Sequence, residues 1–255
     1  MGALERGLRA VRDRGGHAFV PYVTGGFPGV DAALLRALAD AGADAIEVGI
    51  PHSDPIMDGG VIQEASRIAL EHGTRPSDVL DTIREAALSV PVAVMTYVNP
   101  VFRIGYERFA ESLREAGVSG AIVPDLPVDE TEAFGEAAAA CDVDVVLLAA
   151  PGAPTERIAT IGRASHGFVY CVATYGVTGV RGALAGTARS VVEALRPVTD
   201  LPLLVGVGIS TSEHAREACM FADGAIVGSA LMGRLLEGDR DGAIDLARSF
   251  RAAID

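Results

Sequence analysis

Two carboxylates, Glu47 and Asp58, stand out in the stretch AIEVGIPHSDPIMDGG, residues 45–60. Glu47 lies among apolar residues that predict a buried strand, and Asp58 follows in a loop rich in proline and glycine. Acidic residues are seldom buried unless they are paired or used. Burial would raise the pKa of Glu47 toward the range of a general acid or base, whereas Asp58 on a loop would more easily stay ionised. The alternatives are a structural salt bridge from Glu47 to an arginine and a turn-forming role for Asp58.

A second group of residues could bind phosphate. The glycine turns GVGIS (206–210) and VGSA (227–230) each follow an apolar run near the end of the chain. Backbone N–H groups at such turns and at helix N-termini bind phosphate. We therefore predict a phosphate cradle made by Gly208, Gly228 and Ser229, with Gly179 from an earlier loop closing its third side. Ordinary tight turns are the alternative.

Some chemistry is excluded by residues that the chain lacks. None of its 255 residues is lysine, so all 21 basic residues are arginine. Schiff-base chemistry needs a lysine amine and is therefore excluded. His52 is the one histidine expected near the site, so no metal site is predicted. Cys141, Cys171 and Cys219 are widely spaced and are expected to be small buried hydrophobes in a reducing compartment.

Charge and hydropathy narrow the class of protein further. The net charge of −13 argues against nucleic acid, which requires a basic surface, but not against a small phosphorylated substrate. No apolar run approaches the ~18–20 residues that span a bilayer, and the N-terminus lacks the apolar segment of a signal peptide. We expect a cytoplasmic protein without membrane contact.

Eight apolar runs, separated by amphipathic stretches, predict the elements that position these residues. Nearly continuous hydrophobicity is typical of parallel strands that are covered on both faces. Segments such as LADAGADA (38–45) and LREAGVSG (113–120) read as a helix end, a glycine and the next strand. The predicted strands span residues 17–23, 43–50, 90–98, 118–124, 143–150, 166–172, 201–208 and 222–228.

This order predicts a single (β/α)8 TIM barrel over residues 1–255, with an extra N-terminal helix. A doubly wound open sheet is the alternative, although no GxGxxG follows the first predicted strand. Active sites of such barrels lie where the strands end. Besides Glu47, this face receives Tyr97 and Asn99 from the end of the third predicted strand, Asp125 from the end of the fourth and Tyr170 from the end of the sixth.

The motifs closely resemble those of one family, the tryptophan synthase alpha subunit, nearly from end to end. The stretch IEVGIPHSDPIMDGGVIQ is similar to the family's signature around its catalytic glutamate and aspartate. Further similar blocks occur in the family's order: AFVPYVTGGFPG, VMTYVNPV, VPDLPVDE, YGVTG, VGVGIS and GAIVGSALM. Three positions depart from the usual pattern, namely His52, Gly60 and the segment CVATY before GVTG.

The resemblance implies a cofactor-free lyase that splits indole-3-glycerol phosphate into indole and glyceraldehyde 3-phosphate for L-tryptophan biosynthesis. Glu47 would be the general acid/base, and Asp58 would bind the indole N–H. Tyr22, Tyr170 and Thr178 would bind substrate, with Thr178 and Gly179 on a loop that closes over the site. Gly208, Gly228 and Ser229 match the family's phosphate cradle.

The same resemblance implies a partner, a beta subunit that carries pyridoxal phosphate in an alpha2-beta2 heterotetramer. Three alternatives stay open at this stage. The chain could be a free-standing lyase that releases indole, a non-catalytic activator of a beta subunit, or another phosphate-binding barrel such as an isomerase or epimerase.

Overall fold

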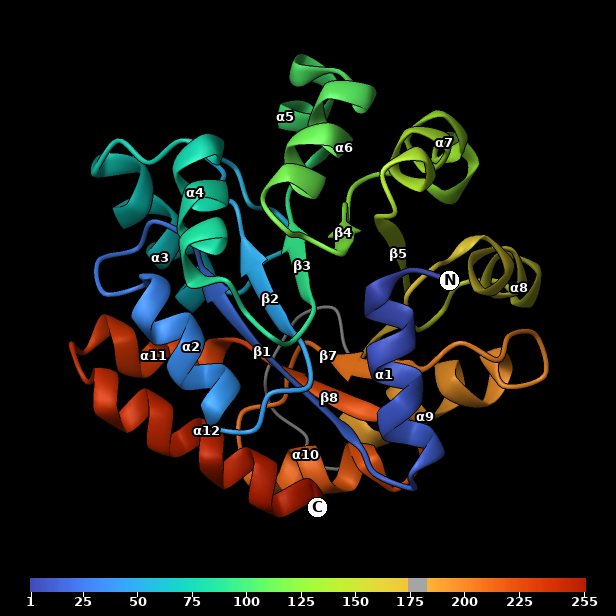
Figure 1. Ribbon diagram of the computed structural model, residues 1–255. Helices are drawn as coiled ribbons and strands as arrows, with labels where there is room; N and C mark the ends of the chain where they lie inside the picture. Colours follow the sequence, from blue (N-terminus) through green and yellow to red (C-terminus); the bar gives the residue numbers. More distant parts are fainter. Residues whose placement is uncertain (174–182) are drawn as a thin grey trace.

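A closed barrel of eight parallel strands forms the centre of the computed structural model, which describes residues 1–173 and 183–255 (Figure 1). Each strand pairs with the next, and β8 pairs with β1, so the barrel has no free edge. The prediction of a (β/α)8 barrel is confirmed, and the open sheet is excluded. The strands are β1 (Ala18–Thr24), β2 (Ile46–Gly49), β3 (Val92–Met95), β4 (Gly120–Ile122), β5 (Asp144–Ala149), β6 (Val169–Val172), β7 (Leu203–Gly206) and β8 (Gly224–Val227).

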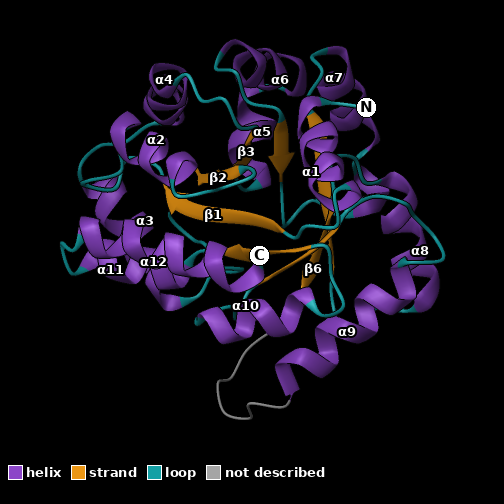
Figure 2. Cartoon of the chain, turned by 60° about the horizontal axis from the view of Figure 1, so that its bottom comes forward, coloured by secondary structure: helices purple, strands orange, loops and turns teal. Residues whose placement is uncertain are grey.

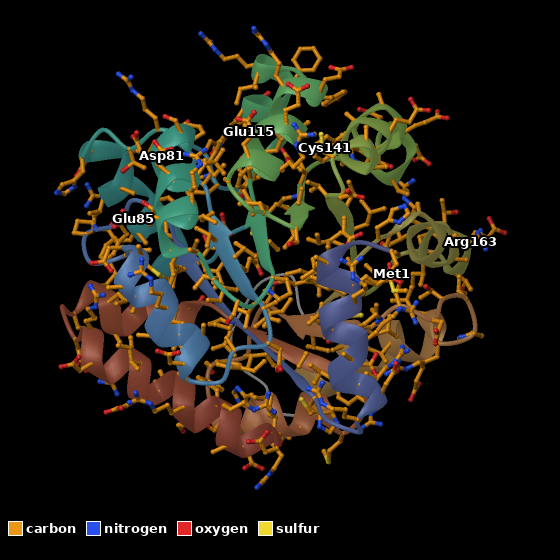
Figure 3. All side chains as sticks on the ribbon, in the orientation of Figure 1. Met1, Asp81, Glu85, Glu115, Cys141 and Arg163 are labelled. Carbon is orange, nitrogen blue, oxygen red and sulfur yellow. The ribbon has the colours of Figure 1, made fainter. Side chains whose placement is uncertain are left out.

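Helices surround the strands on the outside of the barrel (Figure 2). Charged side chains such as the labelled Asp81, Glu85 and Arg163 lie on their outer faces (Figure 3). That residues 1–255 make one domain stays a prediction. The helices are α1 (Ala3–Asp13), α2 (Ala32–Asp40), α3 (Gly60–Glu71), α4 (Pro76–Ala86), α5 (Val98–Ile104), α6 (Tyr106–Glu115), the 3-10 helix η1 (Val128–Glu130), α7 (Glu132–Ala140), α8 (Thr155–Ala164), α9 (Ala183–Leu195), α10 (Ser212–Cys219), α11 (Ser229–Leu236) and α12 (Arg240–Ile254).

Glycines end helices where the sequence predicts it. Gly42 follows α2 with φ +98°, and Gly117 follows α6 with φ +78°. This left-handed conformation suits glycine because it has no Cβ, and it turns the chain toward the next strand. The predicted helix, glycine and strand order is confirmed at both places.

The strands are apolar along their whole length because both of their faces are buried. One set of side chains points outward and packs against the helices in a large cluster that includes Phe19, Ile46 and Val94. The alternate set points into the barrel and forms a second cluster that includes Val20, Ala45 and Tyr170. Glu47 lies two residues after Ala45 in β2, and it therefore points into the barrel.

The predicted extra N-terminal helix closes the bottom of the barrel. Leu4 and Leu8 of α1 are buried in the inner cluster, beside residues at the beginnings of the strands. The carboxylate of Asp144, at the start of β5, accepts the N–H of Glu5 at 3.1 Å. A ligand therefore has access to the barrel from the opposite end, where the strands finish.

Barrel closure between β1 and β8 generates a prediction about packing. Gly224 pairs with Ala18, and a Cβ at Gly224 would overlap the backbone carbonyl oxygen of Ala18. Gly224→Ala should therefore lower the free energy of unfolding by about 1–3 kcal/mol, measured by denaturant titration. Gly233→Ala is the matched control, because Gly233 lies within α11 and a Cβ there meets nothing within 4 Å. This control should stabilise the protein by up to ~1 kcal/mol; equal effects of the two changes would refute the close approach at Gly224.

Candidate active site

Glu47 is buried in the upper part of the barrel without a partner. Its residue exposure is 1%, and it lies level with Tyr22 of β1 and Ala93 of β3. Neither carboxyl oxygen has a hydrogen-bond partner among the residues that the structure describes. None of the ion pairs in this part of the chain involves Glu47, which argues against the structural salt bridge.

The environment of Glu47 favours its protonated form. Burial, and then the negative charge of Asp58, raise the pKa of Glu47 to about 8. At neutral pH the side chain therefore keeps a proton that it can donate. The expected effect of burial on this glutamate is present in the structure.

Asp58 lies near the end of the loop that joins β2 to α3, and Tyr97 holds it there. The hydroxyl group of Tyr97 donates to Asp58 Oδ2 at 3.0 Å, and it accepts the N–H of Met57 at 3.0 Å. Partial burial raises the pKa of Asp58 to about 6, while the hydrogen bond from Tyr97 works against that rise. Asp58 therefore loses its proton at lower pH than Glu47, and the two carboxyl groups differ in charge at neutral pH.

Two tyrosines complete the inner wall. Tyr22 and Tyr170 are both buried, and both interact electrostatically with Glu47 and Asp58, so the four groups lie close together. Desolvation raises the pKa of each tyrosine well above its usual range, which keeps both hydroxyl groups neutral. The Tyr22 hydroxyl lies 3.3 Å from the hydroxyl oxygen of Thr24.

Glycines at two strand ends make room for these rings. A Cβ at Gly49, the last residue of β2, would overlap the hydroxyl group of Tyr22. A Cβ at Gly206, the last residue of β7, would overlap the hydroxyl group of Tyr170. Glycine is therefore required at both strand ends by the tyrosine of a neighbouring strand.

The predicted phosphate cradle lies at the ends of β7 and β8. Gly208 has φ +98°, and it follows Val207, a β-branched residue with the rare φ of +63°. Gly228 precedes α11, and Ser229 is the first residue of that helix. The N–H groups of Gly208, Gly228 and Ser229 donate to no other described residue, and those of Gly228 and Ser229 lie at a helix N-terminus that attracts anions.

Tyr22 connects the cradle to the carboxyl pair. A Cβ at Gly228 would lie 3.1 Å from the Tyr22 ring, while the hydroxyl end of the same ring reaches Gly49, two residues beyond Glu47. The Tyr22 ring thus reaches from Gly228 to the end of β2, the strand that carries Glu47. A small phosphate ester could place its phosphate at one end of this ring and its reacting carbon at the other.

The remaining predicted residues are placed differently. Asn99 does not end a strand but lies within α5, and Asp125 accepts the N–H of Val98 at 2.8 Å at the start of that helix. Thr178 and Gly179 lie outside the described residues. The sequence did not assign Tyr97 a role, although its place after the third strand was the available signal.

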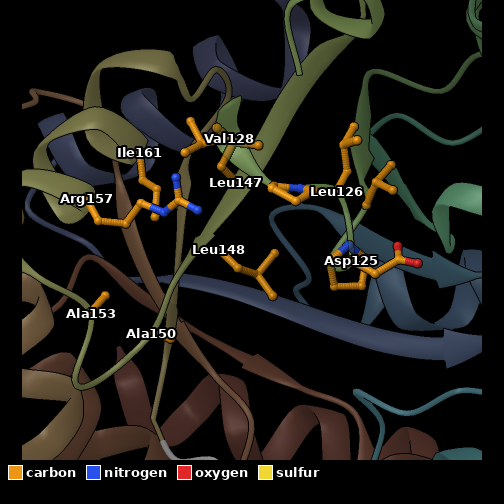
Figure 4. A pocket seen from close by; sticks show the side chains of 12 residues that line it. Asp125, Leu126, Val128, Leu147, Leu148, Ala150, Ala153, Arg157 and Ile161 are labelled. Atoms are coloured by element: carbon orange, nitrogen blue, oxygen red, sulfur yellow. The ribbon is translucent and has the colours of Figure 1, made fainter. Parts of the chain in front are cut away.

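A separate cleft of about 250 Å³ opens between the loops after β4 and β5 (Figure 4). Apolar side chains, including Leu126, Leu147 and Leu148, line it together with Arg157 and Asp125. Leu148 also packs against the inner cluster that contains Tyr170. The cleft therefore lies beside the candidate site, and neither Glu47 nor Asp58 lines it.

The described residues contain neither a metal-binding group nor a membrane-spanning helix. Within residues 1–173 and 183–255, no group of three histidine, cysteine or acidic residues could hold a metal ion. None of the helices in this part of the chain is both long and apolar enough to cross a bilayer.

Comparisons with known proteins place the chain among close relatives. The sequence profile described as "Tryptophan synthase alpha chain" matches residues 8–252. The tryptophan synthase alpha chain of Streptomyces avermitilis is 45% identical over 240 residues, covering 92% of this chain and 87% of that protein. The alpha chain of Streptomyces coelicolor is 44% identical, covering 96% of this chain and 95% of that one.

Solved structures agree with the sequence comparison. A chain in a crystal structure of Mycobacterium tuberculosis tryptophan synthase superposes with a TM-score of 0.92 at 37% identity, covering 99% of this chain and 98% of that chain. Tryptophan synthase subunit alpha from Legionella pneumophila superposes with a TM-score of 0.90 at 32% identity, covering 100% of this chain and 99% of that chain.

The unpartnered Glu47 generates a prediction about stability and pH. A carboxyl group whose pKa is raised by folding, here from 4.5 to about 8, binds its proton more tightly in the native state. The free energy of unfolding therefore falls as the pH rises, by ~1.4 kcal/mol per pH unit between about pH 5 and pH 8. Glu47→Gln should remove this loss, so that denaturant titrations show the variant gaining on the parent as pH rises.

Asp58→Asn is the matched control for this measurement. Because the pKa of Asp58 is raised only to about 6, its replacement should flatten the pH dependence below about pH 6. Above pH 6 the fall in stability should persist but end at a lower pH, because the negative charge that helps to raise the pKa of Glu47 is lost as well. If Glu47→Gln keeps the parental slope between pH 6 and pH 8, Glu47 is not the buried acid of this structure.

Proposed function

The chain belongs to the tryptophan synthase alpha chain family, and we propose that its Glu47 and Asp58 split indole-3-glycerol phosphate into indole and glyceraldehyde 3-phosphate. It is a lyase of L-tryptophan biosynthesis that works with a beta subunit. One observation carries the assignment of the chemistry: Glu47 is a buried carboxyl without a partner, and its pKa of about 8 is coupled to the charge of Asp58.

Cleavage of a carbon–carbon bond needs an acceptor for the bond's electron pair. A lysine imine cannot serve, because the sequence contains no lysine. The indole ring can accept the electrons itself once its carbon C3 is protonated. We assign this proton transfer to Glu47, which is protonated at neutral pH because it is buried.

Asp58 supports the positive charge that protonation places on the ring. With a pKa of about 6, the Asp58 carboxyl group is mostly ionised at neutral pH, and the hydrogen bond from Tyr97 favours the ionised form. A carboxylate that accepts the indole N–H stabilises the charge as it develops. Such stabilisation is strong in a site from which water is excluded.

The second half of the reaction restores the enzyme. After giving its proton to C3, the Glu47 carboxylate removes the proton of the glycerol hydroxyl next to the ring. The oxygen then forms a carbonyl group, the bond to C3 breaks, and its electrons return to the indole ring. One proton leaves Glu47 and one returns, so the side chain ends as it began.

The rest of the proposed site holds the substrate. Gly208, Gly228 and Ser229 offer backbone N–H groups to the phosphate, and the Tyr22 ring spans the distance to the acids. Tyr170 lines the same space from β6. Thr178 and Gly179 complete the proposal from outside the described residues, as substrate contact and phosphate contact respectively.

The partner and cofactor follow from the family. We propose that this chain uses no cofactor and that pyridoxal phosphate is carried by the beta subunit in an alpha2-beta2 assembly. Two large apolar side chains are exposed close to the mouth, Ile56 at 71% and Phe102 at 75%, and they support docking of a partner on this face. A cytoplasmic location stays a prediction.

Indole release from indole-3-glycerol phosphate tests the function directly. The chain should release indole, most rapidly near pH 7, where Asp58 is ionised and Glu47 is protonated, with apparent pKa values of about 6 and 8 for the pair. Strong stimulation by an added beta subunit supports the alpha subunit role, and full activity without it supports a free-standing lyase.

Glu47→Gln should lose nearly all cleavage and still bind glycerol 3-phosphate. Substantial remaining turnover would remove Glu47 from the proton transfers.

Gly228→Val tests the phosphate cradle. The backbone of Gly228, with φ −114°, accommodates any residue, so the added side chain acts by filling space near Tyr22 and the N–H groups. We expect the KM for indole-3-glycerol phosphate to rise at least about tenfold, because charge-assisted hydrogen bonds to phosphate are lost. Gly135→Val on α7, where a Cβ meets nothing within 4 Å, should leave KM unchanged. An unchanged KM in Gly228→Val would place the phosphate elsewhere.

A further inference from the structure

His52 covers one face of the tyrosine that holds Asp58. The rings of His52 and Tyr97 stack with centroids 4.6 Å apart and planes inclined by 24°. Tyr97 is buried, with an exposure of 4%, whereas His52 is half-buried at the surface of the loop. Aromatic pairs in this arrangement stabilise each other beyond the area that they bury.

The hydroxyl group of Tyr97 has a fixed hydrogen-bond direction. Because it accepts the N–H of Met57, its own hydrogen is free to be donated to Asp58 Oδ2. The position of the Tyr97 ring therefore sets where the Asp58 carboxylate lies. A ring that shifts would lose both bonds at once.

His52 is itself fixed by its loop. Its Nδ1 accepts the backbone N–H of Asp54 at 3.1 Å, so Nδ1 is unprotonated in this arrangement. The N–H of Asp58 in turn donates to the carbonyl oxygen of Pro55 at 3.0 Å. One short turn thus carries both the stacking ring and the carboxylate.

The backbone of Tyr97 is held from the other side. Asp125, after β4, accepts the N–H of Val98 at the start of α5. The ionisable groups around the stacked pair are Asp54 and Asp58 on the loop of His52, Asp125 beyond Tyr97, and Tyr22 of β1. Asp125 holds the main chain of Tyr97, while His52 restrains its ring.

We propose that His52 is a positioning residue for the cleavage reaction, which by stacking on Tyr97 keeps the Tyr97–Asp58 hydrogen bond formed and the Asp58 carboxylate directed at the substrate. This proposal rests on the function assigned to Asp58. The histidine ring meets two requirements together, since its face stacks and its Nδ1 accepts a backbone N–H. The face of the His52 ring restrains Tyr97, and the hydrogen bond to Nδ1 fixes the orientation of the His52 ring.

Two substitutions separate these requirements. His52→Phe keeps the stacking ring and loses the acceptor, whereas His52→Asn keeps an acceptor near the Asp54 N–H and loses the ring. For both variants, kcat and KM for indole-3-glycerol phosphate are measured over a range of pH, with and without a beta subunit. Tyr97→Phe is included because it removes the hydroxyl group through which His52 is proposed to act.

His52→Asn should lower kcat about three- to tenfold, with KM within about twofold because the phosphate cradle lies on other loops. The acid limb of its pH–rate profile should move to higher pH, because the hydrogen bond from Tyr97 lowers the pKa of Asp58. The charge of His52 lowers that pKa too, so a shift that His52→Phe shares measures the lost charge, and the larger shift expected in His52→Asn measures the lost stacking. Tyr97→Phe should move the limb in the same direction, and His52→Phe should keep kcat within about threefold. A merely structural role would not move the acid limb of His52→Asn further than that of His52→Phe.

Two results would overturn the proposal. One is a His52→Asn variant with the kcat and the acid limb of the parent protein. The other is a loss of kcat in His52→Phe as large as the loss in His52→Asn. Thermal unfolding of each variant, together with binding of glycerol 3-phosphate, confirms that the protein remains folded. If the parent chain itself releases no indole under any condition, the proposed function fails and the role of His52 falls with it.

Discussion

The buried carboxyl group of Glu47 is the constraint on which the rest of the site depends. A closed barrel turns alternate strand residues inward, and this register leaves Glu47 without a hydrogen-bond partner among the described residues. Desolvation then raises its pKa to about 8. Burial of this group lowers the free energy of unfolding at high pH. The same burial keeps a proton on Glu47 at neutral pH, inside an apolar environment.

The second carboxylate is controlled by a different environment. Asp58 lies on a loop rather than a strand, and the ends of three strands contribute to its position through His52, Tyr97 and Asp125. Its smaller desolvation and its hydrogen bond from Tyr97 leave its pKa near 6. Two neighbouring carboxyl groups thus differ in charge at neutral pH, one protonated and one mostly ionised, which suits one to proton transfer and the other to stabilising positive charge.

The fold was more predictable than the contacts within the site. All eight strands are confirmed in order, because strands buried on both faces are apolar along their length. Their ends were predicted less well. The third predicted strand continued to Val98, whereas β3 ends at Met95 and Val98 begins α5, since Asp125 from another loop accepts its N–H. Apolar composition alone does not distinguish a strand end from a buried helix start.

The sequence by itself determined the barrel, the inward direction of Glu47 and the glycine turns of the proposed phosphate cradle. These features depend on local period and residue type. Only the tertiary structure decided that Tyr97 binds Asp58, that His52 stacks on Tyr97, and that Gly49 gives room to Tyr22. Each of these contacts joins residues from different loops or strands. Barrel closure brings them together, and no local pattern in the chain specifies the distance between them.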